Sequence, residues 1–180
     1  DEYGGAFKVT KGLSSQFPNQ VLTSPISEAG IMAIANGLML RGYLPIVEFM
    51  FGDFLYLAAD QILNHATKFS PMYGNSLPGH CIIRTPMGGR RGYGPTHSQS
   101  IEKSFFGQDN LKVVAVNNFL NPGSLLKWAC NSGTGPILLL ENKLLYGKKQ
   151  EKVPTSFTCH IINENDQTQI LKVTPQEESD

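Results

Sequence analysis

The chain has 180 residues, enough for one domain with a well-buried core. Hydrophobic residues make up 41% and charged residues 17% of it, which is typical of a globular protein and not of a disordered one. Fifteen basic residues balance fifteen acidic ones, so the charge gives no reason to expect nucleic acid or an anionic membrane as a partner. No apolar run approaches the roughly 18 residues that a membrane span needs, which also argues against a membrane protein.

The three cysteines, Cys81, Cys130 and Cys159, are widely spaced and form no CxxC pair. Their odd number and spacing argue against a disulfide framework or a zinc site, so we predict no metal ligands. They favour a reducing compartment, which we expect to be the cytoplasm, or the mitochondrial matrix in a eukaryote.

Short apolar segments alternate with helical patterns along the chain. In chain order they predict a strand at 20–23, a helix at 28–40, a strand at 44–50, a helix at 53–69, strands at 81–84 and 111–116, a helix at 122–131 and a strand at 136–141. Ser27 is a good N-cap for the first helix, and Gly42 follows its end. Continuous apolar strands separated by helices predict an α/β fold, a three-layer parallel sheet flanked by helices.

The predicted helix at 53–69 should have one side that carries Phe54, Leu57, Ala58, Gln61, Ile62 and His65.

After Gly147 the composition becomes polar, with one or two possible edge strands and an acidic end. We therefore expect one domain over 1–147, and over 148–180 a polar connector toward a C-terminal domain outside these residues.

Glu28 in TSPISEAG is the first candidate for chemistry, because ligands of parallel α/β sheets bind beyond the carboxyl ends of the strands. One interpretation is an acid in the first helical turn, favoured there by the helix dipole. The other is a half-buried carboxylate beside an apolar pocket, able to hold and release a proton near neutral pH. Position alone favours the first interpretation.

The second candidate is His97, in the glycine-rich segment RTPMGGRRGYGPTHSQS (84–100). A mobile surface loop is one interpretation of so many Gly and Pro residues. Long loops on rigid α/β scaffolds are also often functional, and a histidine there can act as a general acid or base or bind an anion. The segment contains no phosphate-binding GxxxxGK[ST] motif, and the chain has no HExxH or GxSxG motif.

Seven blocks of sequence together resemble a known family. In order they are YGGAFKVTKGL, TSPISEAG, GYLPIVEFMFGDF, AADQILNHATKF, RTPMGGRRGYGPTHSQS, LKVV and ILLLENKLLYG. They closely resemble the β subunit of the decarboxylating component of thiamine-diphosphate-dependent 2-oxoacid dehydrogenases, within the transketolase-like superfamily. The resemblance covers about Tyr3 to Gly147, and its ordered blocks are highly specific.

The resemblance implies a fold of the pyrimidine-binding, transketolase central domain type that supplies half of a cofactor site. A partner α subunit, or an α segment of the same chain, would hold the diphosphate and its Mg²⁺ through a GDG motif. This chain has GDF at 52–54 in place of GDG. The resemblance further implies that the subunits associate into a dimer or heterotetramer. It also implies that a lipoyl acyltransferase core accepts the acyl group derived from a 2-oxoacid substrate.

The resemblance also implies roles for individual residues. Glu28 matches the acid that hydrogen-bonds the pyrimidine ring nitrogen and so helps to remove the reacting proton. Phe54 matches an aromatic residue that packs on the aminopyrimidine, and Leu57 a cofactor-contacting position that is glutamine in some relatives. His97 matches a histidine near the reacting centre. Ser132 stands where relatives have the Asp of a potassium site, so we expect that site to be weakened or absent.

The resemblance implies a chain that starts earlier, with a helix and a strand before the position of Asp1, and continues into a C-terminal domain, so we expect these residues to be part of a longer chain. The leading hypothesis is oxidative decarboxylation of pyruvate or a branched-chain 2-oxoacid, with acyl transfer to lipoamide. One alternative is a transketolase-like or acyloin-type carboligation with the same cofactor. The other is a non-catalytic assembly module, against which the presence of both Glu28 and His97 argues.

Overall fold

The computed structural model describes residues 2–74, 77–133, 135–153, 155, 157–163 and 169–175. Its α-helices are α1 (Leu13–Gln16), α2 (Glu28–Leu40), α3 (Thr67–Met72), α4 (Glu102–Phe105) and α5 (Pro122–Asn131). Two 3₁₀ segments, η1 (Gly52–Ala58) and η3 (Pro95–His97), and one π-helical segment, η2 (Gln61–Ala66), complete the helical part. The strands are β1 (Ile46–Glu48), β2 (Ile82–Met87), β3 (Lys112–Val116), β4 (Ile137–Asn142), β5 (Phe157–Asn163) and β6 (Gln169–Pro175).

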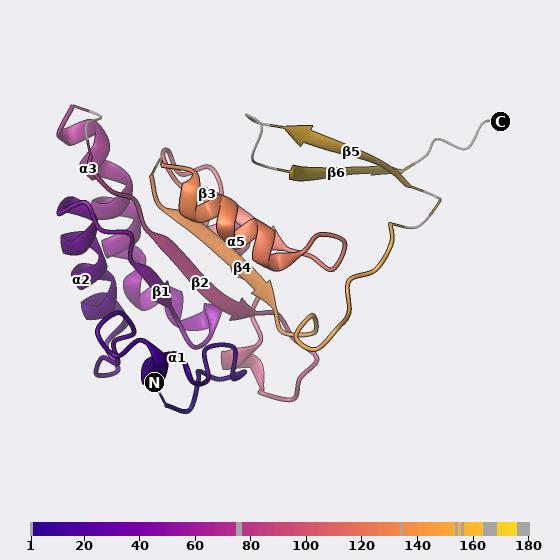
Figure 1. Ribbon diagram of the computed structural model, residues 1–180, viewed down its shortest axis with the longest axis horizontal. Coiled ribbons are helices and arrows are strands. Elements are labelled where there is room, and N and C mark those ends of the chain that lie inside the picture. The colour runs from indigo at the N-terminus through magenta and orange to yellow at the C-terminus, as the bar shows by residue number, and fades with distance from the viewer. Residues whose placement is uncertain are drawn as a thin grey trace.

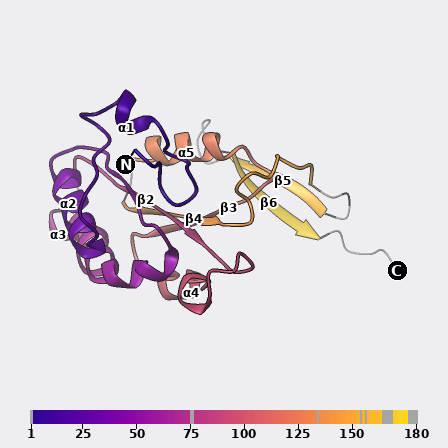
Figure 2. The same cartoon turned by 90° about the horizontal axis from the view of Figure 1, so that it is seen from below.

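The centre of the molecule is a parallel sheet with the strand order β1-β2-β4-β3. The first four residues of β4, Ile137 to Leu140, are all buried because helical layers cover both of its faces. Figure 2 shows the sheet nearly edge-on, with α5 on one side of it and α4 on the other. The structure therefore confirms the predicted α/β fold with a parallel sheet between helices.

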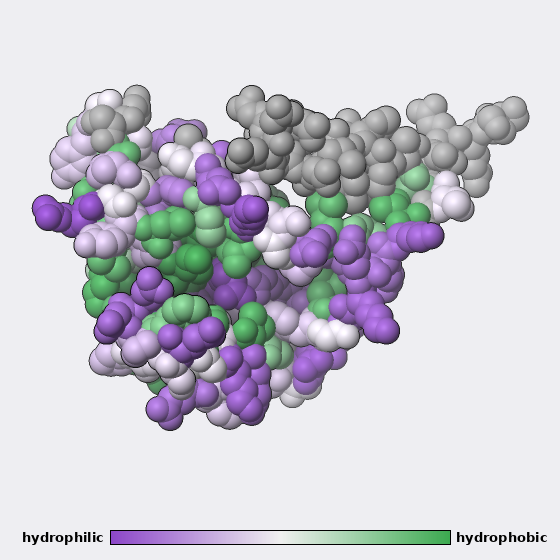
Figure 3. Space-filling model, in the orientation of Figure 1, coloured by the Kyte–Doolittle hydropathy of each residue, from purple (hydrophilic) through white to green (hydrophobic). Residues whose placement is uncertain are grey.

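The two faces of the sheet are buried to different depths. The α2 face holds the larger core, formed by apolar residues of α2, η1, η2, α4 and the strands: Met32, Ala35, Met39, Val47, Phe49, Leu55, Ala58, Ile62, Ala66, Cys81, Ile83, Met87, Ile101, Phe105, Leu138 and Leu140. On the opposite face α5 covers a smaller cluster of Ile82, Ala129, Ile137 and Leu139. Ile46, whose register partner is Ile82, is still 47% exposed at the β1 edge. Figure 3 shows apolar surface on this face, beside α5.

The start and end of α2 follow the predicted signals. Ser27 is the N-cap, and its Oγ accepts a hydrogen bond from the Gly30 backbone N–H at 3.3 Å. A Cβ on Gly30 would lie 2.8 Å from that Oγ, so a larger residue there would require the Ser27 side chain to shift. Gly42 follows the helix with φ at 85°, a left-handed conformation that glycine adopts without strain.

The expected strand at 20–23 is wrong. Gln20 and Val21 both donate backbone hydrogen bonds to the Phe17 carbonyl, at 3.0 and 2.9 Å, so these residues form a turn after α1. Leu22 is 74% exposed. The backbone groups of this segment are satisfied locally, and extended character in the sequence was not enough to predict a strand.

The expected uniform helix at 53–69 is instead a chain of three helical types. In η1 the buried residues Gly52, Leu55 and Ala58 recur every third position, as the 3₁₀ geometry requires. In the wider π turn the buried residues are Ile62 and Ala66. Leu57 directly precedes the buried Ala58 and is 62% exposed, so the two do not share one side of the segment as predicted.

The polar residues after Gly147 contain two strands, where the sequence predicted one or two edge strands. β5 and β6 pair with each other in an antiparallel ribbon, with Phe157 opposite Pro175. They form a separate two-stranded sheet and not an edge of the parallel one. Figure 1 shows this ribbon to one side of the main sheet, reached by an extended connection.

Within the described residues, every helix is too short or too polar to cross a membrane.

Candidate functional site

Three segments meet where the parallel strands end. Residues 49–54 follow β1, the glycine-rich loop 88–100 follows β2, and residues 143–147 follow β4. Because β1, β2 and β4 are adjacent and parallel, their carboxyl ends lie along one edge of the sheet. Ligands of open parallel sheets bind at such an edge.

Aromatic rings fill this edge and bring two of the predicted residues together. The rings of Phe54 and His97 lie 5.2 Å apart, edge to face, and both contact Phe51, at 6.0 and 4.9 Å. Further rings extend the cluster around Phe51: Phe7, Tyr93 and Tyr146. Phe54 and His97 are both half-buried, so one edge of this cluster is open to a ligand.

His97 is held at one of its ring nitrogens. Its Nδ1 lies 2.9 Å from the Oγ1 of Thr96, and its Nε2 has no partner among the described residues. The residue ends the single turn η3, which begins at Pro95 after Gly94 with φ at 76°. The imidazole therefore has one nitrogen available for a substrate or a proton.

Glu28 is the first residue of α2 and is half-buried. Ser27 caps the helix, so the Glu28 carboxylate is not needed for that purpose. It has no hydrogen-bond or ion-pair partner within the described part of the chain. The structure places Glu28 in the first turn of α2, as the helix-dipole interpretation expects, and its catalytic role stays a prediction.

The predicted residues are not all in mutual contact. The structure brings Phe54 and His97 together, and it holds Glu28 on a helix that packs against η1, the segment of Phe54. Leu57 also lies on η1, but its exposed side chain makes no polar or ring contact among the described residues. Its contact with a cofactor also stays a prediction.

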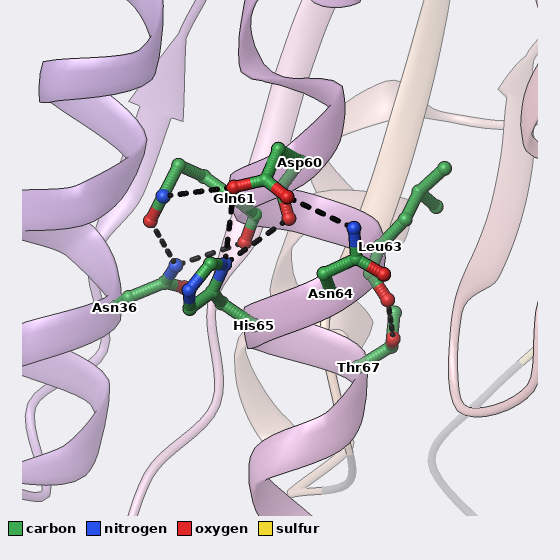
Figure 4. A network of polar contacts seen from close by, with 7 residues as sticks. All are labelled: Asn36, Asp60, Gln61, Leu63, Asn64, His65 and Thr67. Carbon is green, nitrogen blue, oxygen red and sulfur yellow. Dashed lines mark hydrogen bonds and ion pairs between the residues drawn. The ribbon is translucent and has the colours of Figure 1, made fainter.

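A polar network fixes α2 against the helical segment that carries Phe54 (Figure 4). The buried Asn36 of α2 donates from Nδ2 to the Gln61 carbonyl at 2.9 Å. Gln61 Nε2 donates to Asp60 at 3.3 Å, and Asp60 accepts from Asn64 at 2.9 Å. The network sets the position of α2, with Glu28 at its start, relative to the segment that holds Phe54.

Sequence reasoning missed a charged cluster that joins the ends of three strands. Arg84 of β2 donates two hydrogen bonds to Glu141 of β4, at 2.6 and 2.9 Å, and lies 3.4 Å from Glu48 of β1. Tyr146 also donates to Glu141. A Cβ on Gly5 would collide with the Glu48 carboxylate, so the N-terminal segment lies directly on this cluster.

The cluster shifts the ionisation of its members. Burial raises the pKa of Glu48, although the Arg84 charge opposes that shift. Burial acts to lower the pKa of Arg84, but the hydrogen bonds and charges of Glu141 and the charge of Glu48 outweigh it, so that pKa is raised. Burial also raises the pKa of the Tyr146 hydroxyl. Arg84 stays charged, and its bidentate pair with Glu141 is the strong interaction at this edge.

A second set of missed residues surrounds His97. Lys143 directly follows β4, is fully buried, and donates from Nζ to the His97 carbonyl. The buried Asp53 accepts from the Gln99 backbone N–H at 3.3 Å and from its Nε2 at 2.8 Å. Their positions in the sequence could have identified them, because Lys143 directly follows a strand and Asp53 lies near the end of another, at the edge of the sheet that binds ligands.

Metal ligation has no visible basis in the described part of the chain, where no three His, Cys, Asp or Glu side chains are grouped for a metal ion. Ser132, the position of the expected weakened potassium site, donates from Oγ to the Ala129 carbonyl at 3.3 Å. Cys81 and Cys130 are free thiols. The side chain of Cys159 lies outside the described part.

Comparisons with known proteins identify relatives of this chain. Curated relatives include the pyruvate dehydrogenase E1 component subunit beta-2 of Oryza sativa subsp. japonica, 38% identical over 89% of this chain and 44% of that protein. The corresponding beta subunits of Saccharomyces cerevisiae and Homo sapiens are 37% and 36% identical, over 83% and 85% of this chain and 41% and 43% of theirs. The chain thus spans less than half the length of these relatives.

A solved structure shares the fold at low sequence identity. A split-gene transketolase, described as an inactive beta4 tetramer, matches 88% of this chain and 46% of its own with a TM-score of 0.60 and 20% identity. The family model for the transketolase pyrimidine-binding domain matches residues 1–149. With that match over most of its length, the chain belongs to the transketolase pyrimidine-binding domain family.

Proposed function

We propose that this chain supplies the aminopyrimidine half of the thiamine diphosphate site in a 2-oxoacid dehydrogenase. The reaction would be oxidative decarboxylation of pyruvate or a branched-chain 2-oxoacid, with transfer of the acyl group to lipoamide. The curated relatives are beta subunits of pyruvate dehydrogenase, which supports this reaction class. The observation that carries the proposal is the contact of Phe54 with His97 at the edge of the sheet, beside the helix that begins at Glu28.

The residues present fit an aminopyrimidine ring. Phe54 offers a half-buried aromatic surface, and such a ring packs well on another ring. The Glu28 carboxylate, without a partner in the described structure, is available to a ring nitrogen. Leu57 would add apolar contact where some relatives use glutamine. Bound there, thiamine diphosphate would supply the electron sink that lets carbon dioxide leave a 2-oxoacid.

The side chains of this chain would then have distinct tasks. Glu28 holds and returns a proton at the pyrimidine ring nitrogen. His97 uses its available Nε2 to bind the substrate carboxylate or to assist acyl transfer to lipoamide. The rings of Phe51 and Phe54 keep water away from the reacting centre, which strengthens both polar interactions.

A partner must hold the rest of the cofactor. Within the GDF sequence at 52–54, Asp53 is already bonded to Gln99, and Gly52 is packed tightly against Met87 and Ile101. This packing supports a division in which an α subunit or α segment binds the diphosphate and Mg²⁺. The assembly would be a dimer or heterotetramer that delivers acyl groups to a lipoyl acyltransferase core. It would lie in the cytoplasm, or in the mitochondrial matrix of a eukaryote, as the names of several relatives support.

The test is Glu28→Gln in the complete enzyme with its diphosphate-binding partner. Loss of the proton-holding group should reduce 2-oxoacid decarboxylation by roughly 10²- to 10⁴-fold, measured as released carbon dioxide. Glu102→Gln is the matched control, because Glu102 is also the first residue of a helix and lies outside the site. The control should keep full activity.

The measured outcomes separate the alternatives. Normal turnover by Glu28→Gln would contradict the role of Glu28. A wild-type complex that binds the cofactor but releases no carbon dioxide from any 2-oxoacid would support the non-catalytic assembly module. Release of carbon dioxide with transfer to an aldehyde, but not to a lipoyl domain, would support carboligation.

A further inference from the structure

The backbone around His97 is held from outside its own loop. The loop contains Gly92 and Gly94, both with φ at 76°; besides the turn η3, the Gly88 backbone N–H donates to the Gln99 carbonyl at 3.1 Å and joins its two ends. Beyond that turn the chain is attached on both sides of the imidazole. Lys143 donates to the His97 carbonyl, and Asp53 accepts two hydrogen bonds from Gln99.

Lys143 is an unusual residue to find completely buried. Its Nζ lies 4.9 Å from the Phe51 ring centre and 5.2 Å from that of Tyr93, and the Phe51 ring also contacts the His97 imidazole. Burial and the Arg91 charge lower the pKa of Lys143, while the charge of Asp53 raises it. An apolar side chain would fill this position at a lower desolvation cost, which indicates that the donor itself is needed.

Asp53 holds the same loop two residues after His97. It is only 8% exposed, and its Oδ1 accepts both bonds from Gln99. Its Oδ2 is buried and has no hydrogen-bond partner in the described structure. The carboxylate and the ammonium of Lys143 do not form a direct ion pair in that part of the chain, but they act on loop residues only two positions apart.

We propose that Asp53 and Lys143 are positioning residues for His97. Together with Gln99 they form a clamp that fixes the carbonyl of His97 and the backbone two residues later, and so directs the imidazole toward Phe54. The catalytic consequence rests on the proposed function, in which His97 contacts the substrate. The positioning itself is a property of the chain alone and can be measured without any cofactor.

The first test observes the imidazole directly in the 180-residue chain by NMR. The rings of Phe51 and Phe54 shift the His97 Cε1–H resonance, which is assigned by its loss in His97→Ala. Lys143→Met and Asp53→Asn should each move this resonance toward that of an exposed imidazole. Lys127→Met, at an exposed position of α5, should leave it unchanged. The His80 resonance reports the fold, because His80 is buried and its Nε2 lies 2.9 Å from the Ala129 carbonyl.

The second test is a double-mutant cycle in the complete enzyme. Lys143→Met should lower kcat by roughly ten- to a hundredfold, since a misplacement of about 1 Å has that effect, with little change in the KM for thiamine diphosphate. In the His97→Ala background the same substitution should cause no further loss, because its effect passes through His97. A merely structural role would give an additional loss in that background.

Each result supports or overturns the proposal. An unchanged His97 resonance in both variants, with His80 in its native position, would overturn it. If Lys143→Met also displaces His80, the chain has lost its fold, and Asp53→Asn, which keeps the size of the side chain, decides instead. Additive losses in the cycle would equally contradict positioning. An enzyme without 2-oxoacid activity in which the His97 resonance still moves would refute the proposed function and leave the clamp intact.

Discussion

Two groups of charged side chains lie at the same edge of the sheet and are built differently. In the first, Arg84 is paired with Glu141 through two hydrogen bonds and approaches Glu48. In the second, Lys143 and Asp53 are both buried, but each bonds to the His97 loop and not to the other. The first group satisfies its charges internally, while the second uses them to hold a neighbouring segment.

The difference indicates separate purposes. A bidentate arginine–carboxylate pair across adjacent strands fixes the register of the sheet and leaves little capacity for another ligand. A buried oxygen without a partner, as on Asp53, costs free energy, and such groups concentrate where function requires them. Substitutions in the first group should therefore reduce stability, and those in the second should mainly reduce activity.

The largest expected effect is that of Arg84→Met. It leaves the carboxylates of Glu48 and Glu141 next to each other without their cation, and breaking a buried pair in this way costs about 3–5 kcal/mol. The free energy of unfolding from urea titration measures the loss. Arg41→Met, at the exposed end of α2, should change it by less than about 0.5 kcal/mol. A loss below about 1 kcal/mol for Arg84→Met would remove the distinction between the two groups.

A smaller effect is expected for Gly52→Ala, which moves the backbone next to Asp53 without changing any charge. The added Cβ would lie 3.0 Å from the Met87 Cβ and 3.2 Å from the Ile101 Cγ1. Overpacking of this kind costs about 1–3 kcal/mol, and calorimetry should show a lower Tm. Gly37→Ala is the control, because its Cβ would meet nothing within 4 Å. Removing a helix-interior glycine should stabilise the protein by about 0.5–1 kcal/mol. A higher Tm for Gly52→Ala would show that the segment has room to move.

The smallest effect concerns pH and Glu48. Its pKa is raised above the ordinary value of 4.5, so the folded chain holds this proton more tightly than the unfolded chain. The resulting stability is fully present below pH 4.5 and is lost as the pH rises through the folded pKa. The urea midpoint of wild type minus that of Glu48→Gln should therefore fall as the pH rises through this window. A value that rises with pH would mean that the Arg84 charge, and not burial, controls Glu48.

The sequence predicted the fold well where the signal was local. The apolar runs gave every strand of the parallel sheet, and the cap at Ser27 gave the start of α2 to the residue. The segment at 20–23 failed because the decision between strand and turn depends on a pairing partner, which is not a local property. The helical segment predicted at 53–69 is present, but its 3₁₀ and π turns were missed, because a single 3.6-residue period does not describe them.

The site was predictable only in part. Phe54 and His97 could be named from family resemblance, but their mutual contact was not predicted and is seen only in the structure. Lys143 could not be found from its residue type, because lysine after a strand is usually exposed, and only the packed structure shows it buried beside the loop. The same holds for Arg84, Glu48 and Glu141, whose pairing depends on strand order, and strand order was not deduced from the sequence.

The mixed helical segment at 52–72 has a consequence for protein engineering. The Gln61 carbonyl that receives the Asn36 bond lies at the start of the wide π turn. Deleting one residue there would rotate everything that follows by about 100° around the helix axis. Exchange of this segment with that of a relative should therefore transfer residues 52–72 as one block, together with the facing part of α2. A chimera that loses one residue at a junction inside the π turn would present the wrong residues to the core.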